Sequence, residues 1–149
     1  MAEWYWHVHH NELCEPLTEP LENRIAHIRK NKPQGEIKTR LRLMRLVTDP
    51  LPLQLLEAHE ACREAYNSRQ EAYTAYWKVC NSYPGGGKAC MAAEVAYEVA
   101  SIAYSKSQTK YRKLYRAFLP ELETLHELSC LDCPWNGHTI FPRLQEGKG

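Results

Sequence analysis

Two cysteines and one histidine near the end of the chain have the spacing of metal ligands. Cys130 and Cys133 form a Cys-x-x-Cys pair, and His126 precedes the first cysteine by four residues, about one helical turn. Two thiolates at a chain reversal can bind one Zn²⁺ tetrahedrally, and an imidazole one turn earlier can face the same point. The spacing therefore predicts a structural zinc site that contains these three residues.

The fourth ligand of such a site has to come from another part of the chain. We expect His10 or Cys14, provided that the N-terminal strand lies beside the C-terminal segment, and His9 and His138 are further candidates. The alternative to a metal site is a pair of ordinary thiols in a tight turn, one of them packed under Trp135. Redox catalysis is less favoured, because a reactive Cys-x-x-Cys pair usually begins a helix, whereas this pair follows one.

A second candidate site is basic. From Arg24 to Arg45 the chain carries eight Lys or Arg residues and one acid, Glu36. Residues 36–47 alternate apolar and basic side chains, which predicts a half-buried strand with a basic face. That face could bind phosphate or carboxylate, with tryptophans of the first strand stacking on a base; a merely solvated face is the alternative. The predicted anion-binding residues are Lys38, Arg40, Arg42 and Arg45, and the predicted stacking residues are Trp4 and Trp6.

The first predicted strand also contains three histidines, His7, His9 and His10. A His-x-His pair on one strand face can bind metal or serve as acid and base, although strand histidines are also common packing residues. No Ser, Cys or carboxylate has the spacing that would complete a triad with them. The sequence also has no Walker loop, dinucleotide-binding glycine pattern, zinc-protease helix or nucleophile elbow. We therefore expect a protein that is not an enzyme, with a small metal-dependent enzyme as an alternative.

Two long helices dominate the elements that must position these residues. An Ala-Tyr pair recurs at seven-residue intervals on both sides of a glycine-rich break. A seven-residue repeat returns side chains to one helix face, so we expect Ala and Tyr to form one continuous seam. The break lets the chain turn back, which predicts an antiparallel helical hairpin. The pairs are Ala65-Tyr66, Ala72-Tyr73, Ala96-Tyr97 and Ala103-Tyr104, and the break is Ser82-Tyr83-Pro84-Gly85-Gly86-Gly87.

Both ends of the chain predict a small α+β head on this hairpin. Residues 4–10 predict a strand, Thr18-Glu19-Pro20 predicts a helix start, and a second strand over 36–47 would complete a βαβ unit. We expect Pro120 to kink or divide the second long helix. The predicted fold is α+β and predominantly α. Residues 1–49 and 126–142 form the head, with a short strand over 139–141, residues 50–125 form the coiled-coil-like hairpin, and residues 143–149 form a flexible tail.

The composition limits the partners and the cellular compartment that we expect for this chain. The 149 residues carry a formal net charge of +1, so no field of the whole protein indicates nucleic acid. No apolar run approaches the ~20 residues that span a bilayer, and no secretory signal is visible, so we expect a cytoplasmic protein without membrane contact. Its six cysteines would then be reduced. Cys80 and Cys90 flank the break and would pair only in an oxidising compartment.

The chain resembles a group of small uncharacterised proteins that come mostly from bacteriophages and prophages. The resemblance covers nearly the whole chain and is carried by HHNELCEPLTEP (residues 9–20), the Ala-Tyr heptads, CLDCPWNG (130–137) and TIFP (139–142). It implies a phage setting, in the cytoplasm of a bacterial host, and no particular activity. We therefore expect a non-enzymatic protein that binds and blocks a host protein, with inhibition of a host defence such as CRISPR as one instance. A binder of nucleic acid or a nucleotide, through the segment from Arg24 to Arg45, is the alternative, and the hairpin could also support a homo-oligomer.

Overall fold

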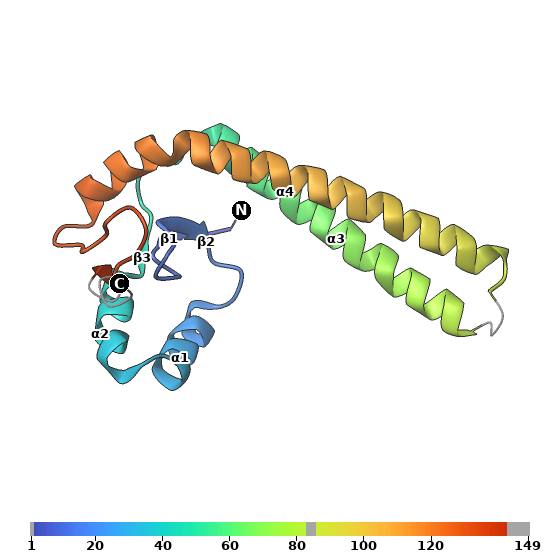
Figure 1. The fold of residues 1–149 in the computed structure, drawn as a ribbon, viewed down its shortest axis with the longest axis horizontal. Coiled ribbons are helices and arrows are strands. Elements are labelled where there is room, and N and C mark those ends of the chain that lie inside the picture. Colours follow the sequence, from blue (N-terminus) through green and yellow to red (C-terminus); the bar gives the residue numbers. More distant parts are fainter. Residues whose placement is uncertain (1, 83–85, 143–149) are drawn as a thin grey trace, which may run out of the picture. The chain divides into compact units, whose positions relative to one another are not determined.

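The computed structural model describes residues 2–82 and 86–142. Within this part of the chain there are four helices and one three-stranded antiparallel sheet, which confirms the predicted α+β, predominantly α fold (Figure 1). The two longest helices, α3 (Leu53–Ser82) and α4 (Lys88–Ser129), form the predicted hairpin. Two expectations fall outside the described residues: the flexible tail over 143–149, and residues 83–85 of the glycine-rich break.

The chain divides into two compact units. Unit 1 comprises Met1–Pro50 and Leu119–Gly149, and unit 2 comprises Leu51–Phe118. Helix α4 belongs to both units and is one continuous helix through Pro120, so the expected division of this helix does not occur. A proline deprives a helix of a single backbone hydrogen bond, and α4 has 42 residues over which the others are retained.

The sheet of unit 1 is built around its first strand. Strand β1 (Trp4–Trp6) pairs with both β2 (Cys14–Pro16) and β3 (Arg45–Leu46), in the order β2-β1-β3. Both pairings are antiparallel, and Trp6 lies opposite Cys14 on one side and Arg45 on the other. The expected βαβ unit needs parallel strands and is therefore wrong. The predicted unit would have joined the segment 4–10 to the segment 36–47, but β3 of the second segment lies antiparallel to β1.

Two short helices complete unit 1. Helix α1 (Leu21–Asn31) begins directly after Pro20, where the sequence predicted a helix start. The strand predicted over 36–47 is wrong, because helix α2 (Gln34–Leu43) occupies most of this segment. Ile37 and Leu41 of α2 and Met44 directly after it are spaced by four and three, and all three pack in the core. This is helical spacing, and the basic residues between them imitate the alternation of a strand.

Two apolar clusters form the core of unit 1. The first contains the buried residues Tyr5, Val8, Ile28 and Met44. The second contains Leu43, Cys130 and Ile140, against which Cys133 and Trp135 pack. Residues 139–141 do not form the predicted strand, but the Ile140 amide donates a hydrogen bond of 3.0 Å to the His10 carbonyl oxygen. The second cluster thus fixes the Cys-x-x-Cys segment within the unit.

The seam between α3 and α4 in unit 2 differs from the predicted Ala-Tyr seam. On α3 the alanines Ala65 and Ala72 are partly buried, while Tyr66 and Tyr73 are each 43% exposed. On α4 the order is reversed, with Tyr97 and Tyr104 partly buried and the preceding alanines exposed. Consecutive helical residues point about 100° apart, so one member of each pair lies deeper between the helices than the other. The deeper member is Ala on α3 and Tyr on α4, while Tyr66 and Tyr73 still contact Tyr104 and Tyr97 across the seam, with ring centroids 5.5 and 5.4 Å apart.

Arg69 occupies the middle of this seam. Its Nη2 donates to the Tyr97 hydroxyl at 3.2 Å and its Nε to Ser101 Oγ at 3.3 Å. The guanidinium also lies 5.7 Å from the Tyr97 ring centroid and 5.6 Å from that of Tyr104, within the range of a cation–π contact. Aromatic and cation–π contacts therefore join the two helices, in addition to the partly buried alanines of α3.

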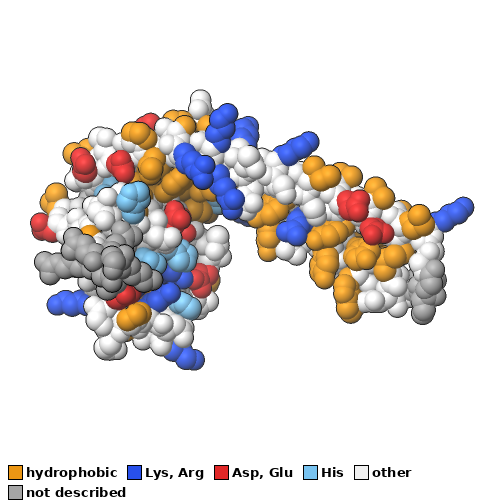
Figure 2. Space-filling view, viewed as in Figure 1, with side chains coloured by type: hydrophobic (Ala, Val, Ile, Leu, Met, Phe, Trp, Pro, Cys, Tyr) orange, Lys and Arg blue, Asp and Glu red, His pale blue; other side chains and the backbone are white. Residues whose placement is uncertain are grey.

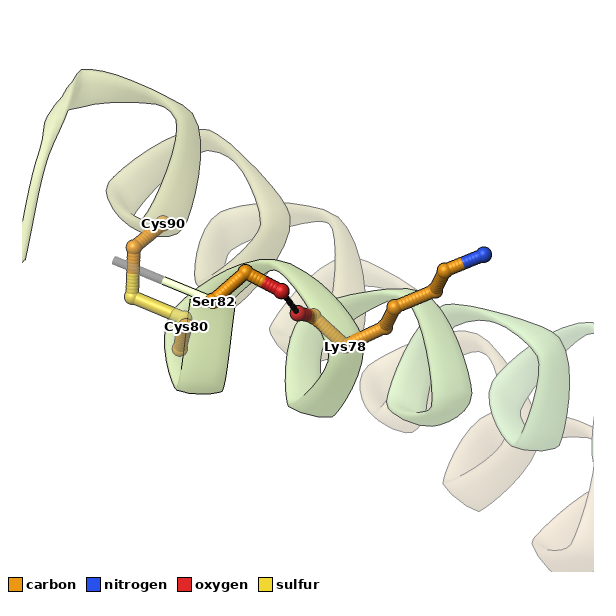
Figure 3. Close-up of a disulfide and its surroundings, with 4 residues drawn as sticks. All are labelled: Lys78, Cys80, Ser82 and Cys90. Atoms are coloured by element: carbon orange, nitrogen blue, oxygen red, sulfur yellow. Dashed lines mark hydrogen bonds between the residues drawn. A yellow bond between two sulfur atoms is a disulfide. The ribbon is translucent and has the colours of Figure 1, made fainter. Parts of the chain in front are cut away.

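A disulfide joins Cys80 of α3 to Cys90 of α4, with their Cα atoms 4.9 Å apart (Figure 3). Beside it, the Ser82 hydroxyl donates to the Lys78 carbonyl oxygen at 2.7 Å, a hydrogen bond that Figure 3 also shows. The expectation that all six cysteines are reduced is thus wrong for this pair. Among the helices of the described residues, none is long and apolar enough to cross a membrane.

Candidate metal centre

Four side chains of unit 1 converge on one point. They are His7, His126, Cys130 and Cys133, and their ligand atoms all lie within 4.8 Å of one another. The first three residues are buried, and Cys133 is partly buried. This group of two imidazoles and two thiols could hold a metal ion.

The end of α4 supplies three of the four residues. His126 lies in the last turn of the helix, and the Cys130 amide donates to the His126 carbonyl oxygen at 2.7 Å, directly after the helix ends at Ser129. Asp132 then adopts a left-handed conformation, with φ of 59°. This conformation, which is uncommon outside glycine, reverses the chain between the two cysteines. Both thiols can therefore approach the imidazole of the preceding turn.

His7 comes from the other end of the chain. It follows β1 directly, and its own φ of 52° is left-handed. Its amide donates to the Leu13 carbonyl oxygen at 3.1 Å, which fixes this turn. Such a conformation costs a non-glycine residue roughly 1–2 kcal/mol and is concentrated at functional sites. It places His7 Nε2 2.9 Å from His126 Nε2 and 3.3 Å from Cys133 Sγ.

These separations are close to those of a tetrahedral zinc site. With Zn–N of about 2.0–2.1 Å and Zn–S of about 2.3 Å, neighbouring ligand atoms stand roughly 3.3–3.8 Å apart. The two measured contacts of His7, 2.9 and 3.3 Å, fall near or slightly below that range. Small rotations of the side chains would therefore open the group enough to admit the ion.

The surroundings favour the form of His7 that binds metal. Its Nδ1 lies 3.2 Å from the Glu12 carbonyl oxygen, so an Nδ1 proton is held there and Nε2 is left with a lone pair. Two indoles enclose the imidazoles: the Trp135 ring centroid lies 5.3 Å from that of His7, and the Trp6 centroid lies 5.3 Å from that of His126. These indoles cover the two imidazoles with apolar surface.

Burial also sets the protonation of the group. Burial, together with the neighbouring His126, lowers the pKa of His7 to about 4, and burial lowers the pKa of His126 as well. Both imidazoles are therefore neutral at pH 7, as metal ligands must be. Burial raises the pKa of Cys133 to about 11, so this thiol keeps its proton in the absence of a cation. A bound divalent metal reverses that preference, because its charge stabilises the thiolate.

The structure brings together the three predicted residues of the C-terminal segment, with His7 in place of His10 or Cys14. His10 is exposed, with its ring centroid 6.3 Å from that of Phe141, and Cys14 is buried in β2, where burial raises the pKa of its thiol to about 12. His9 Nδ1 instead lies 2.7 Å from Glu15 Oε1. The histidine cluster was a signal for the fourth ligand, but its strand pattern did not predict the left-handed turn that selects His7.

The predicted anion-binding residues do not form one site. Arg40 is buried on α2, where Nε and Nη2 donate to Glu36 Oε2 at 2.9 and 2.6 Å. Arg42 is exposed and lies about 200° away around the helix, so the shared strand face does not exist. Lys38 and Arg45 are exposed, on α2 and β3. The predicted stacking residues Trp4 and Trp6 are 6% and 1% exposed and cannot receive a base.

Comparison with protein-family models, with curated protein sequences and with solved structures found no match to this chain. The ligand set combines borderline-soft imidazole with soft thiol donors, which suits zinc better than the oxygen-seeking ions magnesium and calcium.

Proposed function

We propose that this chain is a zinc-binding protein without enzymatic activity, and that His7, His126, Cys130 and Cys133 hold one structural zinc ion. The observation that carries the proposal is the convergence of these four ligand atoms within 4.8 Å. Four protein ligands complete a tetrahedral shell and leave no position for water or substrate, as in structural rather than catalytic zinc sites.

The proposed ion links the two ends of the chain. His7 and His126 are 119 residues apart, and the segments that carry them meet in one small unit. A crosslink over such a separation restricts the unfolded chain strongly, and the binding free energy of a structural zinc is available as folding free energy. The zinc would thus add to the stability that apolar burial gives this small unit.

Metal analysis of protein purified without added zinc tests this proposal. We expect about one equivalent of zinc per chain, because one tetrahedral site takes one ion. The variants Cys130→Ser, Cys133→Ser and His7→Ala should each lose it. His10→Ala and Cys62→Ser are matched controls outside the group and should retain it. Metal-free protein whose stability is the same with and without a chelator would refute the proposal.

We further propose that unit 2 serves to bind another protein. Helix α4 exposes an apolar stripe with a spacing of four, four and three residues, which places all its members on one face of the helix. These side chains remain 57–63% exposed. The stripe consists of Met91, Val95, Val99 and Ile102. Inhibition of a host defence remains a prediction from the resemblance to phage proteins.

The partner would be a host protein with an apolar surface that covers this stripe. Val95→Glu together with Ile102→Glu should abolish the stoichiometric capture of such a protein from host lysate. Helical circular dichroism should be unchanged, because both positions are exposed. Ala96→Glu together with Ala103→Glu is a control pair on an exposed part of the same helix beside the stripe. Equal capture by the wild type and the stripe variant would contradict an interaction at this stripe.

A further inference from the structure

One stretch of α4 in unit 2 is strongly basic. Between Glu98 and Glu121 the helix has no acidic residue and carries five Lys or Arg side chains. All five are exposed, and Figure 2 shows Lys and Arg side chains gathered along the middle of α4. The five residues are Lys106, Lys110, Arg112, Lys113 and Arg116.

These cations share the face of α4 that points away from the seam. At about 100° per residue they fall within an arc of roughly 160°, opposite the partly buried Tyr104 and Tyr111. Lys106, Lys110 and Lys113 form a row along one side of this arc. Beside the row, Ser105 and Thr109 line a shallow depression together with the lysines. The face therefore offers cations with hydroxyl groups between them.

Nothing in the described part of the chain neutralises these five residues. None of them forms an ion pair or hydrogen bond with another described residue, whereas Arg63 of α3 pairs with Glu60 and Arg69 contacts Tyr97. Like charges three or four residues apart on a helix repel each other, as Lys106 and Lys110 do. An anionic ligand that spans the face would relieve this repulsion.

We propose that this face of α4 binds the phosphodiester backbone of double-stranded nucleic acid. The five cations span eleven residues of helix, a rise of about 15 Å, and duplex DNA carries one negative charge per about 1.7 Å of its axis. Lys110 and Arg112 lie at the two edges of the arc, so that cations can reach the strands on both sides of a groove. The contacts are to phosphates, and the binding is therefore independent of base sequence.

The phosphates of a duplex fit this face better than an acidic protein segment does. The cations stand in a broad arc with hydroxyl groups among them, and within unit 2 the large exposed apolar side chains of α4 end at Ile102, which lines one end of the depression beside the first lysine of the row. An acidic protein helix would be expected to contact the exposed apolar side chains as well as the cations. The proposal is independent of the zinc site, since all five cations belong to unit 2.

Fluorescence anisotropy with a labelled DNA duplex of about two helical turns tests the proposal on the full chain. If all five cations contact phosphates, log Kd should change with log salt with a slope of magnitude about 4.5. Replacing Lys106, Lys110 and Lys113 by Gln should reduce that slope by about 3 and weaken binding at low salt. Glutamine is nearly as good a helix former as lysine, so the fold should be retained, which circular dichroism and the zinc content verify.

The matched control removes the same three charges from the basic stretch of unit 1, through Lys30→Gln, Lys32→Gln and Lys38→Gln. This variant should bind the duplex with an unchanged slope. Equal losses in the two variants would overturn the proposal, as would the absence of salt-dependent duplex binding at low ionic strength. Tighter binding of poly-glutamate than of the duplex to the wild type would also overturn it, in favour of an acidic protein ligand.

Discussion

The two units of this protein reach a folded state by different means. In unit 1 the described residues form two buried apolar clusters, and the proposed metal ligands lie in the same interior. In unit 2 the only buried residues among those described are Leu55 and Ala58. Its two helices are joined instead by half-buried side chains and by the Cys80–Cys90 disulfide. One unit therefore depends on contacts between distant segments, and the other on a repeated local pattern with one covalent link.

The arginines of the two units are stabilised by different kinds of contact. Arg24 and Arg40 are buried in unit 1, where Arg24 Nη2 donates to the Val8 carbonyl oxygen at 2.8 Å and Arg40 pairs with Glu36. Arg69 in the seam of unit 2 contacts tyrosine rings and hydroxyls. A buried guanidinium without partners would be costly, whereas a half-buried one can rely on aromatic faces and water.

Removal of zinc should show the difference in stability between the two units most clearly. Structural zinc contributes on the order of 10 kcal/mol in small domains, so chelation should unfold unit 1 while the hairpin keeps its helical structure. Trp4, Trp6 and Trp135 belong to unit 1, and Trp77 belongs to unit 2. Near-ultraviolet circular dichroism should thus lose most of its tryptophan signal, while most of the far-ultraviolet helical signal remains.

The experiment is done on the wild type with the His7→Ala and His10→Ala variants beside it. The first variant should behave as chelated protein without chelator, and the second should behave as wild type. Simultaneous loss of the near- and far-ultraviolet signals on chelation would contradict the comparison, because it would mean that both units depend on the metal.

The hairpin could be predicted from the sequence because its signal is local. Heptad recurrence and a glycine-rich break need no knowledge of the rest of the chain. The same signal could not show which member of each Ala-Tyr pair faces the seam. The two residues of each pair repeat with the same period, so the period does not say which of them lies deeper between the helices. Only the packing of the two helices decides this, and it places Ala72 deeper on α3 and Tyr97 deeper on α4.

The candidate metal ligands could likewise be predicted only where they lie close together in the sequence. His126, Cys130 and Cys133 are brought together by one helical turn and one chain reversal, which sequence spacing can indicate. The position of the fourth ligand depends on the left-handed conformation of His7 and on the meeting of the two chain ends. Neither feature can be recognised from a periodic pattern in the sequence. The prediction for segment 36–47 was wrong for a related reason, since twelve residues with alternating basic side chains satisfy both a strand and a helix pattern.

Removal of the disulfide of unit 2 should have the next largest effect. Cys80 and Cys90 are ten residues apart, and closing a loop of this size stabilises a folded state by about 3 kcal/mol in the chain-entropy model. Cys80→Ser together with Cys90→Ser should lower the free energy of unfolding of the hairpin by about that amount and leave the zinc content unchanged. Urea unfolding followed by far-ultraviolet circular dichroism measures the loss. Unchanged unfolding in the variant would show that the link adds nothing to the seam.

The smallest expected effect tests the phase of the seam. Ala72 is partly buried between the helices, whereas Ala103, in the equivalent pair on α4, is exposed. Ala72→Leu should overpack the seam and cost about 1–3 kcal/mol in the free energy of unfolding. Ala103→Leu adds the same atoms to an exposed position and should change it by no more than about 0.5 kcal/mol.

Urea unfolding of the two single variants is compared with that of the wild type, with the disulfide intact. Because leucine and alanine are both strong helix formers, a difference between the two variants reports packing rather than helix propensity. Equal destabilisation would mean that both alanines face a helix, as in a single Ala-Tyr seam. A larger effect at Ala103 would contradict the assignment and place Ala103, rather than Ala72, deeper between the helices.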